Sequence, residues 1–251
     1  DIRSTLKKDI IDFQYVMPIL AKRGLPNSRG IILSGPPGTG KTMYAKSLAA
    51  ECRHLSTILI SSEMIRNTHD VKSTFRLARK LAPSLIIVED IDTAGTVSRK
   101  FANHPILGEY LQAMDGLESN DGVIVLATTN HTEDIDPAIS DRPGRFDRII
   151  EVGLPKSIQR REIIDILLGK YPVAKITKTT VNHLVKYSSG LSGAWIREII
   201  QSALILAISQ ERDEIMDDDL IESIGDVLKR RGMAYKSTPN GKSSKPQVYY
   251  Q

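Results

Sequence analysis

The sequence predicts an α/β protein: a doubly wound, parallel five-stranded sheet followed by a small all-helical domain. Short apolar runs alternate with segments of helical periodicity up to residue 154, and only helical patterns follow Pro155. A glycine-rich loop joins the first apolar run to a helix. Strands that alternate with helices usually pair in parallel, with helices on both faces of the sheet. We therefore expect domains at residues 1–154 and 155–231, and a flexible basic tail at 232–251.

The chain begins with a lead-in helix and a strand–loop–helix unit. The helix is expected at about residues 6–22, because Gly24 suits the position after a helix end and Pro26 follows it. The apolar run 31–33 predicts a buried strand, and a helix is expected at 42–51. The loop between these two elements carries the most specific motif of the chain.

That loop reads Gly35-x-x-x-x-Gly40-Lys41-Thr42, the complete phosphate-binding pattern. Its glycines let backbone N–H groups point at phosphate oxygens, Lys41 reaches the β- and γ-phosphates, and the Thr42 hydroxyl binds Mg²⁺. The following helix turns its positive end to the same phosphates. The alternative is a Gly/Pro turn before an ordinary helix. The residues expected to bind ATP are Gly35, Pro36, Pro37, Gly38, Thr39, Gly40, Lys41, Thr42 and Met43.

Two further strands flank the next helix. The run 57–60 predicts a strand, and apolar residues at helical spacing predict a helix over 71–81 that Pro83 ends. The run 85–88 predicts a third, fully buried strand.

The remaining elements complete the sheet and the second domain. A helix at 106–114 precedes strands at 123–127 and 149–152, and Leu154-Pro155 is expected to be a hinge. Four helices are then expected at 157–168, 181–187, 192–210 and 217–231.

Acidic and amide side chains follow two of the predicted strands. Glu89 and Asp90 end the third strand, and Asn130 ends the fourth. The carboxyl ends of parallel strands meet at one edge of the sheet, where ligands bind. Two carboxylates there can hold Mg²⁺ and orient an attacking water. Alone, each group could equally be a solvated strand end or an ordinary turn residue.

Composition sets broad limits on the class of protein. The 251 residues carry a net charge of +4, and no apolar run approaches the roughly 20 residues that span a bilayer. Cys52 is the single cysteine, so no internal disulfide forms, and the cytoplasm or another reducing compartment is expected. The start at Asp1 rather than Met is compatible with a fragment. The basic tail reads as a solvated segment, with polyanion binding as the alternative.

In sequence order, these motifs resemble the AAA+ ATPases of the classical AAA clade, over about residues 20–210. A weaker likeness, to the mitochondrial Rieske-protein translocase branch, lies in the segment 23–30 and in the Glu-Asp order. The motifs that carry the main resemblance are Gly35–Thr42, Glu89-Asp90-Ile91-Asp92, Asp115-Gly116, Ala127-Thr128-Thr129-Asn130, Asp136-Pro137-Ala138, Arg142-Pro143-Gly144-Arg145-Phe146-Asp147-Arg148 and Gly190-Leu191-Ser192-Gly193-Ala194.

The resemblance implies a role for each matching residue. Glu89 corresponds to the Walker B acid that holds the metal, Asp90 to the acid that orients water, and Asn130 to the sensor 1 residue. Arg145 and Arg148 correspond to arginine fingers that act on the ATP of a neighbouring subunit, because an inserted guanidinium stabilises the charge of the γ-phosphate. The alternative for these arginines is a structural salt-bridge loop.

The resemblance also implies a helical lid and a homo-oligomeric ring, such as a hexamer, that acts on a protein substrate or adaptor. Gly193 and Ala194 would let the lid backbone approach the nucleotide, whereas Trp195 stands where the clade usually has Asp. Most of the clade has Asp-Glu where this chain has Glu89-Asp90, so the water-orienting arm is shorter by one methylene. Slow hydrolysis is therefore expected.

In this chain, the segment that corresponds to the pore-lining segment of protein-threading AAA+ ATPases differs from theirs. No aromatic residue stands between Ile60 and Phe75, and Phe75 is expected in the core. Met64 and Ile65 are expected to pack. That leaves Arg66, Asn67 and His69, polar groups that give weak, water-competed contacts, so poor processive unfolding is expected.

Three functions fit these observations. The first is Mg-dependent ATP hydrolysis by a ring that remodels, translocates or disassembles a protein or protein complex. The second is a DNA-associated AAA+ machine, although the chain lacks a helix-turn-helix pattern and an aromatic-interleaved basic patch, so nucleic acid is not the expected partner. The third is a nucleotide-controlled scaffold that hydrolyses ATP rarely.

Overall fold

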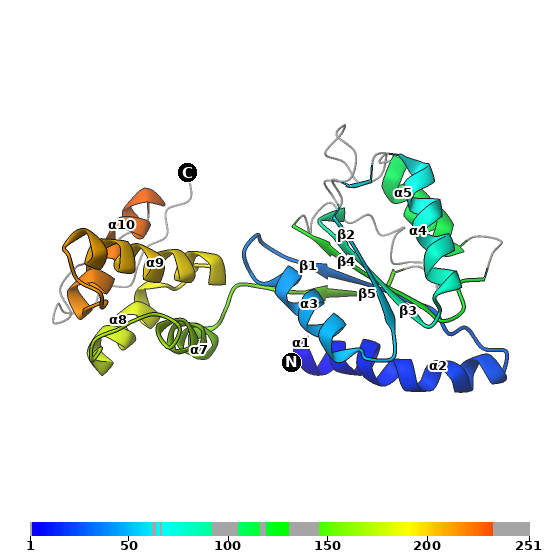
Figure 1. Ribbon diagram of the computed structural model, residues 1–251, viewed down its shortest axis with the longest axis horizontal. Coiled ribbons are helices and arrows are strands. Elements are labelled where there is room, and N and C mark those ends of the chain that lie inside the picture. The colour runs from blue at the N-terminus through cyan, green and yellow to red at the C-terminus, as the bar shows by residue number, and fades with distance from the viewer. Residues whose placement is uncertain are drawn as a thin grey trace. The chain divides into compact units, whose positions relative to one another are not determined.

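A computed structural model describes residues 2–61, 64–65, 67–91, 105–115, 119–130 and 146–232. The chain is divided into two compact units, Asp1–Gly153 and Leu154–Gln251 (Figure 1). Among the described residues, no helix has both the length and the apolar character needed to cross a bilayer.

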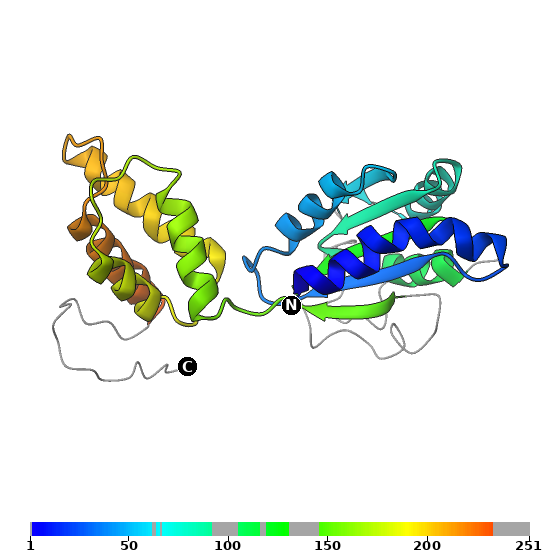
Figure 2. The same ribbon diagram turned by 90° about the horizontal axis from the view of Figure 1, so that it is seen from below.

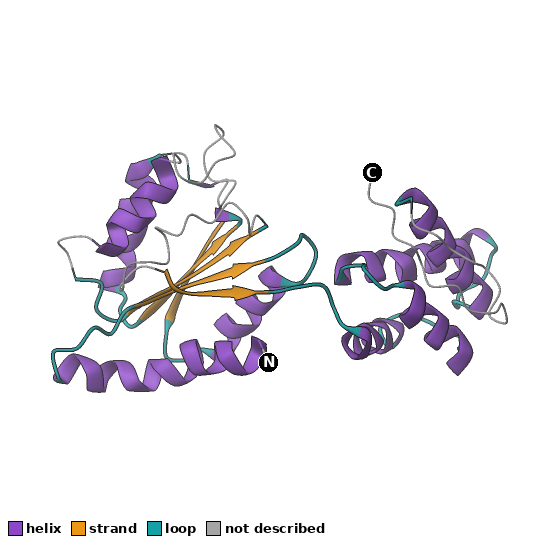
Figure 3. Ribbon diagram, turned by 180° about the vertical axis from the view of Figure 1, so that it is seen from behind, coloured by secondary structure: helices purple, strands orange, loops and turns teal. Residues whose placement is uncertain are grey.

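The first unit is built on a sheet, seen in Figure 3, that is covered by helices. The sheet has five strands in the order β2-β3-β4-β1-β5. All four neighbouring pairs are parallel, which confirms the predicted doubly wound fold. The order places β1 between β4 and β5, so the loop after β1 opens beside the carboxyl end of β4. The strands are β1 (Arg29–Ser34), β2 (Ser56–Ser61), β3 (Ser84–Glu89), β4 (Val123–Thr129) and β5 (Phe146–Glu151).

Helices cover both faces of this sheet (Figure 2). Alternate side chains of each strand point to opposite faces, so Ile31 and Leu33 pack with the lead-in helix and α3 (Lys41–Glu51), whereas Ile32 packs on the other face. That second face is covered by α4 (Thr68–Lys80) and α5 (Pro105–Asp115). The buried strands therefore have two apolar faces, as their continuous hydrophobic runs predict.

The lead-in segment differs from the single helix predicted at 6–22. It consists of α1 (Ile2–Leu6), a π-helical turn η1 (Lys7–Asp12) and α2 (Phe13–Lys22). The first turn was missed because Ile2 is followed by three polar residues. Apolar side chains at intervals of three or four residues form its buried face: Leu6, Ile10, Phe13 and Met17.

Three other elements start three residues before their predicted positions. One is α8 (Lys178–Tyr187), whose N-cap Thr177 accepts the Thr180 N–H. Helix α4 begins at Thr68 rather than at 71, because the Asn67 side chain accepts the N–H groups of His69 and Asp70 at 2.9 and 3.1 Å and caps the helix. Strand β5 begins at Phe146 rather than at 149, because Phe146 is buried and pairs with Gly30 of β1.

In its described residues, the second unit is built of helices with one isolated β-bridge, and it has its own apolar core. Arg160 joins two of these helices: its Nε and Nη2 donate to the Val185 carbonyl at 3.1 and 2.9 Å, and its Nη1 donates to Pro155 at 3.0 Å. Burial lowers the pKa of this guanidinium. The described helices are α7 (Ser157–Leu168), α8 (Lys178–Tyr187), α9 (Gly193–Ser209) and α10 (Asp217–Arg230).

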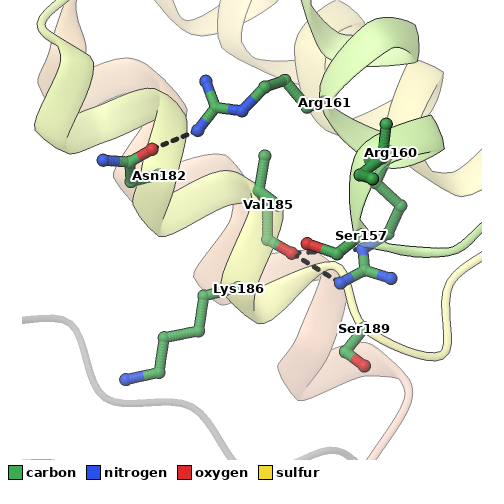
Figure 4. Close-up of a pocket in the computed structure, with 8 residues that line it drawn as sticks. Ser157, Arg160, Arg161, Asn182, Val185, Lys186 and Ser189 are labelled. Carbon is green, nitrogen blue, oxygen red and sulfur yellow. Dashed lines mark hydrogen bonds between the residues drawn. The ribbon is translucent and has the colours of Figure 1, made fainter.

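A surface pocket of about 560 Å³ lies between α7 and α8 (Figure 4). Arg161 donates a hydrogen bond to Asn182 at one side of it, and Arg160 binds the Val185 carbonyl at the other. Because the Arg160 guanidinium is used to join the two helices, the pocket reads as a consequence of helix packing. Its lining contains none of the residues predicted to bind ATP: it consists of Ser157, Ile158, Arg160, Arg161, Asn182, Val185, Lys186 and Ser189.

Asp219 stabilises the start of α10 and supports a pH-dependent prediction. Its carboxylate accepts two hydrogen bonds from Arg212, at 2.8 and 2.6 Å, and one from the Met216 N–H at 2.8 Å. The hydrogen bond from Arg212 lowers the pKa of Asp219. The stabilisation is therefore complete above the ordinary Asp pKa and is lost as the pH falls through the lowered one.

We expect Asp219→Asn to destabilise the helical unit by about 1–3 kcal/mol at neutral pH, and by much less in strong acid. Trp195, the single tryptophan of the chain, lies in this unit, so its fluorescence during urea unfolding reports the effect. Asp218→Asn, which changes an exposed neighbour, is the matched control. Equal destabilisation by both substitutions would contradict the assignment.

Candidate functional site

The loop between β1 and α3 has a backbone that requires glycine. Gly35 has φ +145°, and a Cβ atom at this position would stand 2.3 Å from the Val152 carbonyl oxygen. Gly40, with φ +99°, precedes the first residue of α3 in a left-handed conformation. The loop therefore turns sharply from the end of a buried strand into a helix N-terminus, the geometry in which backbone N–H groups gather around an anion.

Lys41 is the buried cation of this loop. The residue is 5% exposed, and its Nζ donates to the carbonyls of Gly35 and Pro36 at 2.7 and 3.0 Å and to Asn130 Oδ1 at 2.7 Å. An ammonium in this position is held at the loop by oxygen atoms that a bound phosphate can replace. The geometry thus places a positive charge where the loop would receive phosphate.

Asn130 connects the lysine to the acids of β3. Its Oδ1 accepts from Lys41, and its Nδ2 donates to Asp90 Oδ1 at 3.1 Å. The three residues follow β1, β4 and β3, which are neighbours in the sheet. The structure therefore brings Lys41, Asn130 and Asp90 together in one hydrogen-bonded series at the carboxyl edge of the sheet.

Glu89 lies beside the first turns of α3. Its Oε1 is 3.2 Å from the Nζ of Lys46. Lys46 follows Thr42 by four residues, so both residues lie on the same face of α3, the face from which Lys46 reaches Glu89. A hydroxyl and a carboxylate on neighbouring elements fit Mg²⁺, which binds few protein groups and takes its other ligands from phosphate and water. No group of three or more His, Cys, Asp or Glu side chains in the described part of the chain is arranged to hold a metal without phosphate.

Of the two predicted arginine fingers, the structure describes Arg148 but not Arg145. Arg148 lies in β5, with its Nε 3.1 Å from Oδ2 of Asp9 in the π-helical turn η1. Asp9 is only 1% exposed, and its other oxygen is 3.1 Å from Arg29. Arg148 therefore forms an ion pair within its own chain, as the alternative salt-bridge interpretation expects, and its action on a neighbour stays a prediction.

Three other predicted residues lie in the first turns of helices. Gly193 and Ala194 form the first turn of α9 in the second unit, and Met43 lies exposed in the first turn of α3. In the pore segment, Ile65 is buried as expected, but Met64 is 70% exposed, so its predicted packing role is wrong. Ile65 joins the apolar core of the first unit, whereas the residue before it stays at the surface.

The pore prediction also named residues 66, 67 and 69. Arg66 lies outside the described residues, Asn67 caps α4, and His69 lies in the first turn of that helix. Phe75 is buried in the core, as predicted. Asp92, the segment 136–138 and the tail 232–251 were also singled out from the sequence, and all but Gly232 of these lie outside the described residues.

Three residues at the site were not singled out individually from the sequence. Thr128 accepts the Asp90 N–H, Lys46 pairs with Glu89, and Asp9 pairs with Arg148. The one sequence signal was that Thr128 stands two residues before Asn130, a spacing at which side chains of an extended chain point to the same side. The other two contacts join segments that no local pattern connects.

The parallel sheet, the glycine-dependent loop and the buried lysine define the class of P-loop nucleotide-binding proteins. Within that class, residues 31–154 match the model of the "ATPase family associated with various cellular activities (AAA)". The chain belongs to this family of ATPases.

Curated relatives agree with this assignment. The chain is 33% identical over 233 residues to a proteasome-activating nucleotidase of Methanothermobacter thermautotrophicus, covering 88% of this chain and 56% of the relative. It is also 33% identical over 229 residues to the ATP-dependent zinc metalloprotease FtsH 2 of Sphaerobacter thermophilus, covering 88% of this chain and 35% of the relative. The chain therefore spans about a third to three-fifths of the length of such relatives.

Proposed function

We propose that this chain binds Mg·ATP and hydrolyses it to remodel, translocate or disassemble a protein or protein complex. The observation that carries the proposal is the hydrogen-bonded series of Lys41, Asn130 and Asp90 beside a glycine-dependent loop. It combines a cation for the phosphates, an amide at the γ-phosphate position and a carboxylate that can orient water.

Each residue has a distinct task in this proposal. The loop N–H groups and Lys41 hold the phosphates, and Thr42 and Glu89 hold Mg²⁺, which neutralises charge on the β- and γ-phosphates when bound. Asp90 accepts a hydrogen bond from the attacking water and fixes its direction. Asn130 holds the Asp90 carboxylate on one side and reaches the γ-phosphate region on the other.

The protein substrate and the ring are supported by relatives and by chemistry. The names of two relatives describe a nucleotidase that activates a proteasome and an ATP-dependent protease, so both concern proteins rather than nucleic acid. Arginine fingers from a neighbour would complete each site, which makes a homo-oligomeric ring, such as a hexamer, part of the proposal. A cytoplasmic or other reducing compartment suits the single buried thiol of Cys52.

Replacing Lys41 tests the proposal at its binding step. We expect Lys41→Ala to weaken Mg·ATP binding about 100-fold, because charge-assisted hydrogen bonds to phosphate are lost. Isothermal titration with a slowly hydrolysed ATP analogue measures the affinity.

Two further variants make this experiment specific. Lys41→Met keeps the side-chain volume and should show the same loss. Lys80→Ala, an exposed lysine at the end of α4 and just before β3, should bind as the wild type does. Binding by Lys41→Met at wild-type affinity would refute the proposed phosphate site.

A further inference from the structure

The turn after β3 is held by a side chain of β4. The paired register of the two strands ends at Val88 and Ala127. Beyond it, the backbone N–H of Asp90 donates to Thr128 Oγ1 at 2.9 Å. Thr128 is fully buried, so this hydroxyl has a fixed position and water does not compete for it.

Asp90 has a backbone conformation that depends on such support. Its φ is +50°, in the left-handed region that residues other than glycine seldom adopt. Aspartate tolerates this region better than most residues, but an L-residue stays there only where its surroundings hold it. The hydrogen bond from its N–H to Thr128 is one such restraint, and it acts on the residue that the proposed function uses to orient water.

Thr128 and Asn130 hold Asp90 at two different points. Thr128 binds its backbone, and Asn130 donates to its carboxylate at 3.1 Å. Thr128 lies in β4 and Asn130 directly follows that strand, and hydrogen bonds from both positions reach Asp90. The backbone contact matters more for aspartate than for glutamate, because a side chain with one methylene fewer has less freedom to correct a displaced backbone.

We propose that Thr128 is a positioning residue for ATP hydrolysis: its hydroxyl fixes the Asp90 backbone so that the short carboxylate meets the attacking water. This inference rests on the proposed function. In this proposal Thr128 makes no contact with ATP. Replacing Thr128 should therefore change the rate of the chemical step and not the affinity for the nucleotide.

The test compares Thr128→Val, which keeps the shape and removes the hydroxyl, with Thr128→Ser, which keeps the hydroxyl. We expect Thr128→Val to lower kcat about 10- to 100-fold, since a displacement near 1 Å has effects of this size. The KM and the affinity for a slowly hydrolysed analogue should stay within about twofold of the wild type. Thr128→Ser should recover most of the lost kcat.

The outcomes separate this inference from the proposed function. A wild-type chain that binds ATP but never hydrolyses it, alone or at high concentration, would overturn both. A wild-type chain with turnover and a Thr128→Val variant of equal kcat would overturn the role of Thr128 alone, as would a Thr128→Ser variant no better than Thr128→Val. Analogue-binding stoichiometry gives the folded fraction, so a loss of folded protein is not counted as a loss of kcat. Should Thr128→Val not fold, Thr128→Ala replaces it in the same comparison with Thr128→Ser.

Discussion

Replacing Asp90 by asparagine is expected to lower ATP turnover at least about 100-fold while ATP affinity stays within about threefold of the wild type. Asparagine has the shape of aspartate, and its Oδ1 can still accept from Asn130 as the Asp90 Oδ1 does at 3.1 Å. The charge that polarises the attacking water is lost, whereas the loop that binds the phosphates is unchanged. The Asp90→Asn variant should therefore keep ATP binding and lose ATP hydrolysis.

Steady-state phosphate release and titration with a slowly hydrolysed analogue measure the two quantities. Asp121→Asn is the matched control, because Asp121 is an exposed acid at the opposite end of β4. It should leave both quantities unchanged. Hydrolysis by Asp90→Asn at the wild-type rate would show that another group orients the water.

The sequence predicted the start of β4 at the correct residue and the start of β5 three residues too late, for a physical reason. Residues of β4 are buried along the whole strand, and the first five of them read as a continuous apolar run. Strand β5 at the sheet edge has mostly exposed side chains, and only Phe146 and Ile150 are not exposed. Its start therefore depends on pairing with β1, which no local pattern shows.

One part of the candidate site could likewise be predicted from the sequence, and another part could not. The phosphate loop is contiguous, and each of its glycines and its lysine can be assigned from spacing alone. The left-handed Asp90 and its Thr128 partner could not be predicted, because Thr128 is 38 residues away in the chain and is brought there by strand pairing. The pair between Asp9 and Arg148 likewise joins the lead-in segment to the last strand, so the sequence left two interpretations of Arg148 open.

An equal mixture of an Arg145→Ala chain and an Asp90→Asn chain is expected to hydrolyse ATP, although each variant alone is nearly inactive. A finger that acts on a neighbour makes each site from two chains: one supplies Asp90 and the next supplies Arg145. In a head-to-tail ring with random mixing, about a quarter of the interfaces combine an intact Asp90 with an intact Arg145. Turnover per subunit should thus recover to about a quarter of the wild-type value.

Arg145 is the better test residue because Arg148 also pairs with Asp9 in its own chain, so its removal would disturb the fold as well as any neighbour. The matched control mixes Lys41→Ala with Asp90→Asn. Every site in that mixture lacks either the lysine or the acid of its own loop and strand, so no arrangement of subunits restores activity. Turnover of the wild-type chain should also rise with protein concentration as the ring assembles. A mixture of Arg145→Ala and Asp90→Asn chains no more active than either variant alone, or a turnover that is flat from dilute monomer upward, would mean that each chain hydrolyses ATP without its neighbour. Recovery in the control mixture would mean that Lys41 and Asp90 of one site need not belong to the same chain.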